Sequence, residues 1–134
     1  MYSKILFLNF LAASLMIMAI YCDDQGFQPL QEISPNDKQF VKVFQKMIPQ
    51  MVERMNSTKL YRIIAFQHVY TFQMVGVIYD AIFVMGETKC EKSQIKRYNY
   101  CKFTDKQAQC GCDIWVDPSG REDHKLNKFL CEPL

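Results

Sequence analysis

The chain has 134 residues, with 16 basic and 14 acidic side chains, so its formal net charge at pH 7 is only +2. This near balance, with no basic stripe along the sequence, argues against a nucleic-acid partner, because little positive charge is present to neutralise phosphates. The length suits one domain with a small core, so covalent support is expected.

Residues 1–22 are predicted to be a secretory signal peptide. Lys4 supplies their only charge, and an apolar run follows it. The run approaches the length of a membrane span, but Asp23 and Asp24 follow directly, without a basic stop-transfer flank. We therefore expect cleavage and a secreted, extracellular protein with no membrane anchor.

Two cleavage sites fit this leader, one after Ala19 and one after Cys22. Cleavage after Cys22 leaves a single domain of residues 23–134, with 15 basic and 14 acidic side chains. The choice of site decides whether the secreted chain keeps Cys22.

An amphipathic helix is predicted to begin near residue 34. Ser34 would be its N-cap, Pro35 its first helical residue and Asp37 the end of a capping-box-like pattern. Pro49 lies within the helical pattern and removes a backbone donor at a cost of about 3 kcal/mol, so we expect a kink or two shorter helices. Apolar residues recur at spacings of three and four along one face: Phe40, Phe44, Met47, Ile48, Met51, Val52 and Met55.

Two long strands joined by a tight hairpin are predicted next. Residues 60–75 are rich in β-branched and aromatic side chains and contain no proline or glycine. A second strand should cover residues 77–84 and end at Gly86, Glu87 and Thr88. Because Gly76 is the only residue between the strands that turns freely, the hairpin is expected to bend at or just before it.

The C-terminal third is expected to contain a loop and two short strands. Residues 91–105 are polar and predict the loop. Residues 114–116 and 126–131 predict the strands, separated by the turn Asp117-Pro118-Ser119-Gly120. An antiparallel sheet with one solvated face needs a cover on the other, which the amphipathic helix can provide. The predicted fold class is therefore α+β, with one long helix on a four- to five-stranded antiparallel sheet.

Five of the six cysteines gather in the last third of the chain: Cys90, Cys101, Cys110, Cys112 and Cys131. In a secreted chain such a cluster forms disulfides, each worth about 2–4 kcal/mol. A zinc site at Cys110-Gly111-Cys112 with His124 is the alternative, but this spacing does not match the paired ligands that tetrahedral zinc takes. We expect no metal and no cofactor.

Enzymatic activity is not expected. The only histidines, His68 and His124, belong to no recognisable catalytic triad or metal motif. The sequence also contains no glycine-rich phosphate loop.

Nine landmark residues form an ordered series along the chain: Gly76, Tyr79, Gly86, Thr88, Cys90, Cys101, Cys110, Pro118 and Cys131. In the order and nearly the spacing of these residues, the chain resembles the secreted type 2 cystatins over essentially the whole of residues 23–134. The segment from residue 62 to residue 90 can be laid on the family pattern without a gap. This resemblance implies a cystatin-like fold and reversible inhibition of papain-like, cathepsin-type cysteine proteases.

Family members occlude the protease cleft with a wedge of three parts, and the resemblance assigns each part here. The glycine of the N-terminal arm would be Gly26, and the second hairpin would present Pro118 and Ser119. The first hairpin would present Phe72, Gln73, Met74, Val75 and Gly76.

Two diagnostic side chains of the wedge are absent. Phe72 stands at the family's glutamine position, and Ser119 stands at its tryptophan position. Aromatic anchors are often worth about 2 kcal/mol, so the missing tryptophan alone corresponds to roughly thirtyfold weaker binding. Trp115 is expected in the core rather than as a substitute. The alternative function is therefore a non-inhibitory cystatin-like secreted protein that binds another protein.

The family's pairing implies disulfides between Cys90 and Cys101 and between Cys110 and Cys131. Cys112 is additional, and several states are open to it. It could pair with a retained Cys22, take the place of Cys110, remain free, or link two chains. The expected assembly is a monomer, or a dimer through Cys112.

Asn56 stands just after the predicted helix, where some type 2 cystatins carry an asparagine that inhibits legumain-type proteases. Its neighbours, Met55 and Ser57, differ from the usual serine and aspartate. The same asparagine begins the only N-glycosylation sequon, Asn56-Ser57-Thr58, so a glycosylated turn is the alternative.

Overall fold

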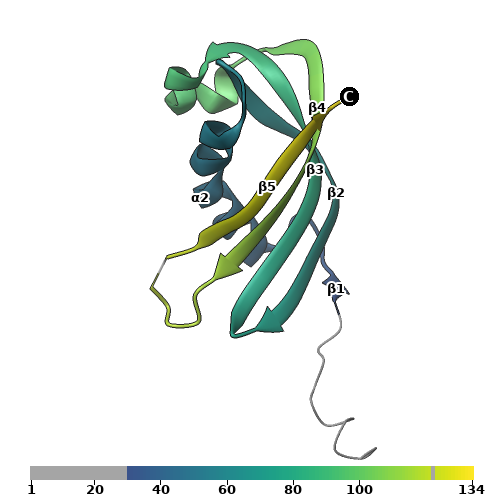
Figure 1. The fold of residues 1–134 in the computed structure, drawn as a ribbon, viewed down its shortest axis with the longest axis vertical. Helices are drawn as coiled ribbons and strands as arrows, with labels where there is room; N and C mark the ends of the chain where they lie inside the picture. Colours follow the sequence, from purple (N-terminus) through teal and green to yellow (C-terminus); the bar gives the residue numbers. More distant parts are fainter. Residues whose placement is uncertain (1–29, 122) are drawn as a thin grey trace, which may run out of the picture.

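The computed structural model describes residues 30–121 and 123–134. A five-stranded antiparallel sheet, in the order β1-β2-β3-β4-β5, curves around one helix (Figure 1). The elements are β1 Gln31–Glu32, α2 Lys38–Arg54, β2 Lys59–Met74, β3 Gly76–Glu91, the 3-10 segment η1 Lys92–Tyr100, β4 Phe103–Val116 and β5 Lys125–Pro133. The predicted class, a long helix on an antiparallel sheet, is confirmed.

The predicted signal peptide and its cleavage sites lie outside the described residues. Within the described part of the chain, no helix combines the length and apolar character needed to span a membrane.

The N-cap of helix α2 lies three residues later than predicted. Asp37, rather than Ser34, is the cap, because the Asp37 carboxylate accepts a hydrogen bond from the Phe40 amide at 3.0 Å. Ser34 closes a turn instead, its hydroxyl accepting from the Asn36 amide at 3.1 Å. The helix runs through Pro49 as one element, so the expectation of two shorter helices was wrong.

The core forms between one face of α2 and the facing side of the sheet. Phe44 of the helix meets Phe83 of β3 edge to face, with ring centroids 5.2 Å apart, and Phe40 meets Phe66 of β2 at 5.4 Å. The helix residues that are buried are Phe40, Val43, Phe44, Met47, Met51 and Val52. The predicted apolar face is thus confirmed, and its aromatic contacts contribute beyond their buried area.

Strands β3 and β4 are longer than predicted. β3 continues through Gly86 to Glu91, so Gly86 does not end it. A Cβ at Gly86 would lie 2.7 Å from the Phe103 ring and 2.8 Å from Ile64, so this glycine makes room for neighbouring side chains. The predicted loop over residues 91–105 is η1 followed by the start of β4, and the predicted short strand at 114–116 is the end of a 14-residue strand.

The two implied disulfides, Cys90–Cys101 and Cys110–Cys131, are confirmed. Cys112 forms no disulfide with the described cysteines and is 3% exposed. The alternative in which Cys112 replaces Cys110 in the disulfide to Cys131 was therefore wrong. A dimer through Cys112 is also disfavoured, because a sulfur enclosed in the core cannot reach a second chain.

The buried Cys112 thiol should make stability sensitive to alkaline pH. Burial raises its pKa from 9.0 to about 12. A thiol that ionises less readily in the folded chain contributes stability fully below its unfolded pKa, and that contribution is lost as pH rises through the folded pKa. Urea unfolding from pH 8 upward should therefore show the wild type losing stability relative to Cys112→Ala. A constant difference between the two proteins would contradict this.

Candidate functional site

The turn between β2 and β3 and the loop between β4 and β5 lie at the same end of the sheet, at the bottom of Figure 1. In the hairpin, Gln73 pairs with Val77 and Met74 pairs with Gly76. Val75 is therefore the tip residue, and its side chain is 82% exposed. The predicted bend at or just before Gly76 is where the structure has it.

Gly76 meets two separate requirements for glycine. Its φ of +95° lies in a region that other residues rarely adopt. A Cβ at this position would overlap the Val116 carbonyl oxygen and lie 2.8 Å from Trp115 Nε1 and 3.2 Å from Pro118 Cδ. The hairpin tip thus sits directly against the start of the second loop, and a larger residue would push the two apart.

Trp115 joins the two turns. Its indole Nε1 donates a hydrogen bond to the Val75 carbonyl oxygen at 2.7 Å, and the Lys125 ammonium lies 5.8 Å from its ring centroid. The expectation that Trp115 lies in the core was wrong. Ile114 is fully buried, so strand alternation directs Trp115 to the opposite face of the sheet.

The face away from α2 carries an apolar row just behind the tip. Phe72 pairs with Ile78, and Ile78 pairs with Trp115, so these three side chains lie on one face. Phe72 is only partly exposed, whereas Gln73 and Val75 are exposed. The structure therefore places Phe72 behind the tip rather than on it.

The second loop is shaped by Asp117, a residue that the sequence analysis did not single out for a role. Its carboxylate accepts a hydrogen bond from the Ser119 amide at 2.8 Å, and this bond lowers the pKa of the carboxyl. Pro118 and Ser119 are exposed. The signal was present in the sequence, since an aspartate side chain readily accepts a hydrogen bond from the backbone amide two residues later.

The N-terminal segment approaches the same end of the sheet. β1 is antiparallel to β2, with Gln31 opposite Thr71 and Glu32 opposite Tyr70, so the start of β1 is its end nearer the hairpin tip. The contact between His68 Nδ1 and Glu32 Oε1, at 3.1 Å, links the two strands. Gly26, the expected glycine of the arm, lies outside the described residues.

Asn56 lies at the opposite end of the sheet from these two turns. It is exposed in the turn after α2, beside the start of β2, where Lys59 pairs with Glu91 at the other end of the hairpin. It borders a groove of about 850 Å³ lined also by β4 and β5 residues such as Gln107 and Leu130. Among the described residues, no group of three or more potential metal ligands comes together.

Comparisons with known proteins identify the fold. No protein-family model and no curated protein matched the sequence. Dimeric human cystatin F superposes with a TM-score of 0.66 at 18% identity, over 83% of this chain and 94% of that one. Mialostatin, a gut cystatin from the hard tick Ixodes ricinus, superposes with a TM-score of 0.61 at 17% identity, over 79% of this chain and 99% of that one.

The chain has the cystatin fold. The cystatin-like fold that the landmark residues implied is therefore confirmed. Mouse fetuin-B, in its inhibitory complex with human meprin beta, shares the fold with a TM-score of 0.65 at 16% identity. There the match covers 81% of this chain but 37% of fetuin-B. The surface formed by the β2–β3 turn and the β4–β5 loop, at one end of this sheet, is called the hairpin edge below.

Replacing Trp115 by phenylalanine should loosen the hairpin tip while keeping the aromatic ring. The change removes the hydrogen bond to Val75, worth about 1 kcal/mol. We expect faster amide hydrogen exchange at residues 74–76, measured by NMR, and unchanged exchange in α2. Tyr100→Phe, which removes the hydroxyl group of an exposed aromatic at the other end of the sheet, should leave the tip unchanged. Equal exchange in wild type and Trp115→Phe would mean that the indole does not hold the tip.

Proposed function

We propose that this protein is a secreted inhibitor of papain-like cysteine proteases, and that it reversibly occludes the active-site cleft with its hairpin edge. The observation that carries the proposal is the contact between the two turns. Gly76 packs against Pro118, and the Trp115 indole donates a hydrogen bond to the Val75 carbonyl oxygen. Two turns held against each other form one narrow edge that needs little ordering when it enters a cleft, which favours affinity.

Each part of the edge has its own role in this proposal. Val75 leads the tip and offers an apolar contact, and Gly76 shapes the bend. Pro118 and Ser119 extend the edge along the second loop, while Phe72 and Trp115 support it from behind. Gln73 and Met74 flank the tip, and the arm around Gly26 would add a third contact.

A titration against papain and a cathepsin tests the proposal. The purified secreted protein should inhibit both reversibly, and active enzyme should return on dilution. The missing tryptophan and glutamine predict weaker inhibition than an intact wedge would give, by roughly thirtyfold for the tryptophan alone. Absence of inhibition at micromolar concentration would refute cysteine-protease inhibition by this edge.

A second candidate is a cystatin-like protein that does not inhibit cysteine proteases and binds another secreted protein. The observation in its favour is that mouse fetuin-B, which has the same fold, forms an inhibitory complex with human meprin beta. The absence of the two diagnostic wedge residues points the same way. A panel of secreted proteases of other classes, including meprin beta, would separate this candidate from the first.

Asn56 supports two mutually exclusive proposals. As an exposed asparagine after α2, it could enter a legumain-type protease, whose recognition would require a bare side chain. As the first residue of a sequon, it would carry a glycan that masks this loop. Digestion of the secreted protein with an N-glycosidase decides between them: a mass loss assigns the glycan, and no loss followed by legumain inhibition assigns the protease contact.

A further inference from the structure

Positive charge is concentrated in the connection between β3 and β4. Residues 89–102 contain five basic side chains and one acidic side chain, Glu91. Glu91 is already paired with Lys59, at 2.7 Å, and the Lys92 ammonium donates to the Met55 carbonyl oxygen. Four exposed cations remain without an ion-pair partner among the described residues: Lys89, Lys96, Arg97 and Lys102.

Three of these cations surround one concavity of about 310 Å³. Lys89, Arg97 and Lys102 line it, together with Gln94, Tyr100 and the Cys90–Cys101 disulfide. Tyr100 is 83% exposed at this site. The three cations thus come from the end of β3, from η1 and from the residue before β4, and they line one hollow.

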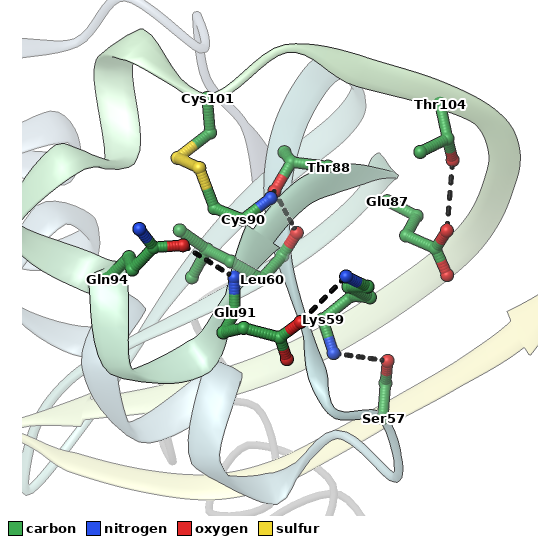
Figure 2. Close-up of polar contacts among 10 residues, drawn as sticks. All are labelled: Ser57, Lys59, Leu60, Glu87, Thr88, Cys90, Glu91, Gln94, Cys101 and Thr104. Carbon is green, nitrogen blue, oxygen red and sulfur yellow. Dashed lines mark hydrogen bonds and ion pairs between the residues drawn. A yellow bond between two sulfur atoms is a disulfide. The ribbon is translucent and has the colours of Figure 1, made fainter.

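The backbone that carries these cations is firmly held (Figure 2). The Cys90–Cys101 disulfide closes the connection, and the Lys89 amide donates to the Lys102 carbonyl oxygen at 2.9 Å. Gln94 Oε1 accepts from the Glu91 amide at 2.9 Å, as half of a capping box. Binding a ligand here would therefore require ordering of side chains only, which limits the entropic penalty.

We propose that this basic concavity binds a sulfated polysaccharide. Sulfate oxygens accept charge-assisted hydrogen bonds from lysine and arginine, and three unpaired cations around one hollow match several sulfates on neighbouring sugars. The exposed Tyr100 ring offers a flat apolar surface and a hydroxyl group to a sugar ring. A folded protein fits less well, because the centres of protein interfaces are depleted in lysine.

The location of the concavity leaves the proposed protease edge free. η1 lies at the top of Figure 1, whereas the turn between β2 and β3 and the loop between β4 and β5 lie at the opposite end of the sheet. Both surfaces can be occupied at once. The expected consequence is an inhibitor held near sulfated chains outside the cell, although polysaccharide binding itself does not depend on protease inhibition.

Calorimetric titration of the secreted protein with a heparin hexasaccharide tests the proposal. Binding should weaken as salt rises, because the cations are solvent-exposed. The triple variant Lys89→Gln, Arg97→Gln, Lys102→Gln should bind roughly tenfold more weakly or worse. The control triple Lys38→Gln, Arg54→Gln, Lys128→Gln loses the same charge elsewhere and should stay within about twofold of wild type.

Several results would overturn the proposal. These are no hexasaccharide binding by the wild type, unchanged affinity in the first triple variant, or an equal loss in both triples, which would mean that only net charge matters. Tighter binding of a polyglutamate peptide than of the hexasaccharide would also overturn it, in favour of an acidic protein partner. Urea unfolding of both variants confirms that each is folded before binding is compared.

Discussion

Alanine at Gly76 is expected to lower the free energy of unfolding by about 2–5 kcal/mol and to weaken protease inhibition at least as strongly. About 1–2 kcal/mol comes from placing a Cβ at a φ of +95°. A further 1–3 kcal/mol comes from overpacking against Val116 and Trp115. Because the strain is relieved by separating the two turns, the edge should lose its shape even where the chain stays folded.

Two other glycines separate the causes of this effect. Gly120 has a φ of +74° but no neighbour within 4 Å of an added Cβ, so Gly120→Ala should show the conformational cost alone, about 1–2 kcal/mol. Gly111 has only an ordinary contact, at 3.8 Å to the Ala81 carbonyl oxygen, so Gly111→Ala should change stability by no more than about 0.5 kcal/mol.

Urea unfolding and papain titration of all three variants give the measurements. Equal losses at Gly76 and Gly120 would show that the contact between the two turns contributes nothing. Normal inhibition by a folded Gly76→Ala protein would show that the inhibitory edge lies elsewhere.

Alanine at Leu126 should destabilise the protein by about 2–5 kcal/mol. Leu126 is 4% exposed and belongs to the core cluster with Ile114 and Phe83. Removing its side chain leaves a cavity in this core. Since domains of this size are stable by only about 5–15 kcal/mol, one such cavity removes a large share of the total.

Leu130 supplies a matched control on the same strand. It is 78% exposed, so Leu130→Ala should change the free energy of unfolding by no more than about 0.5 kcal/mol. Both variants are compared by the midpoint of urea unfolding, with unchanged slope as the sign that the unfolded state is unaffected. Similar losses at the two leucines would contradict the assignment of the strand faces.

The burial of these two leucines could not be predicted from the alternation of side chains along a strand. They are four residues apart, so a regular strand would place them on the same face. The strand pairing is irregular here: Asp113 pairs with Lys128, whereas the next residue, Ile114, pairs with Leu126. Asn127 is therefore an extra residue in β5, as in a β-bulge. As a result, the side chain of Leu126 points into the core and that of Leu130 points to solvent. Nothing in the local residue pattern marks that position.

Only part of the hairpin edge could be predicted from the sequence. Gly76 is the only free turning residue in a long strand-forming region, so the position of the tip followed from composition. The role of Trp115 depends on Val75, 40 residues earlier, and on which face of β4 the indole occupies. Net charge likewise concealed the cations of residues 89–102, because acidic residues elsewhere in the chain balance them in the total.

The sequence by itself determined the features that depend on short-range interactions: the apolar face of α2, the β-forming segments and the bend at Gly76. Its resemblance to a known family added the disulfide pairs Cys90–Cys101 and Cys110–Cys131. Tertiary structure alone decided the extension of β3 past Gly86, the face of Leu126 and the contact of Trp115 with the hairpin tip. The physical reason is that these features depend on cross-strand pairing between residues distant in the chain, where register and irregularities outweigh local preference.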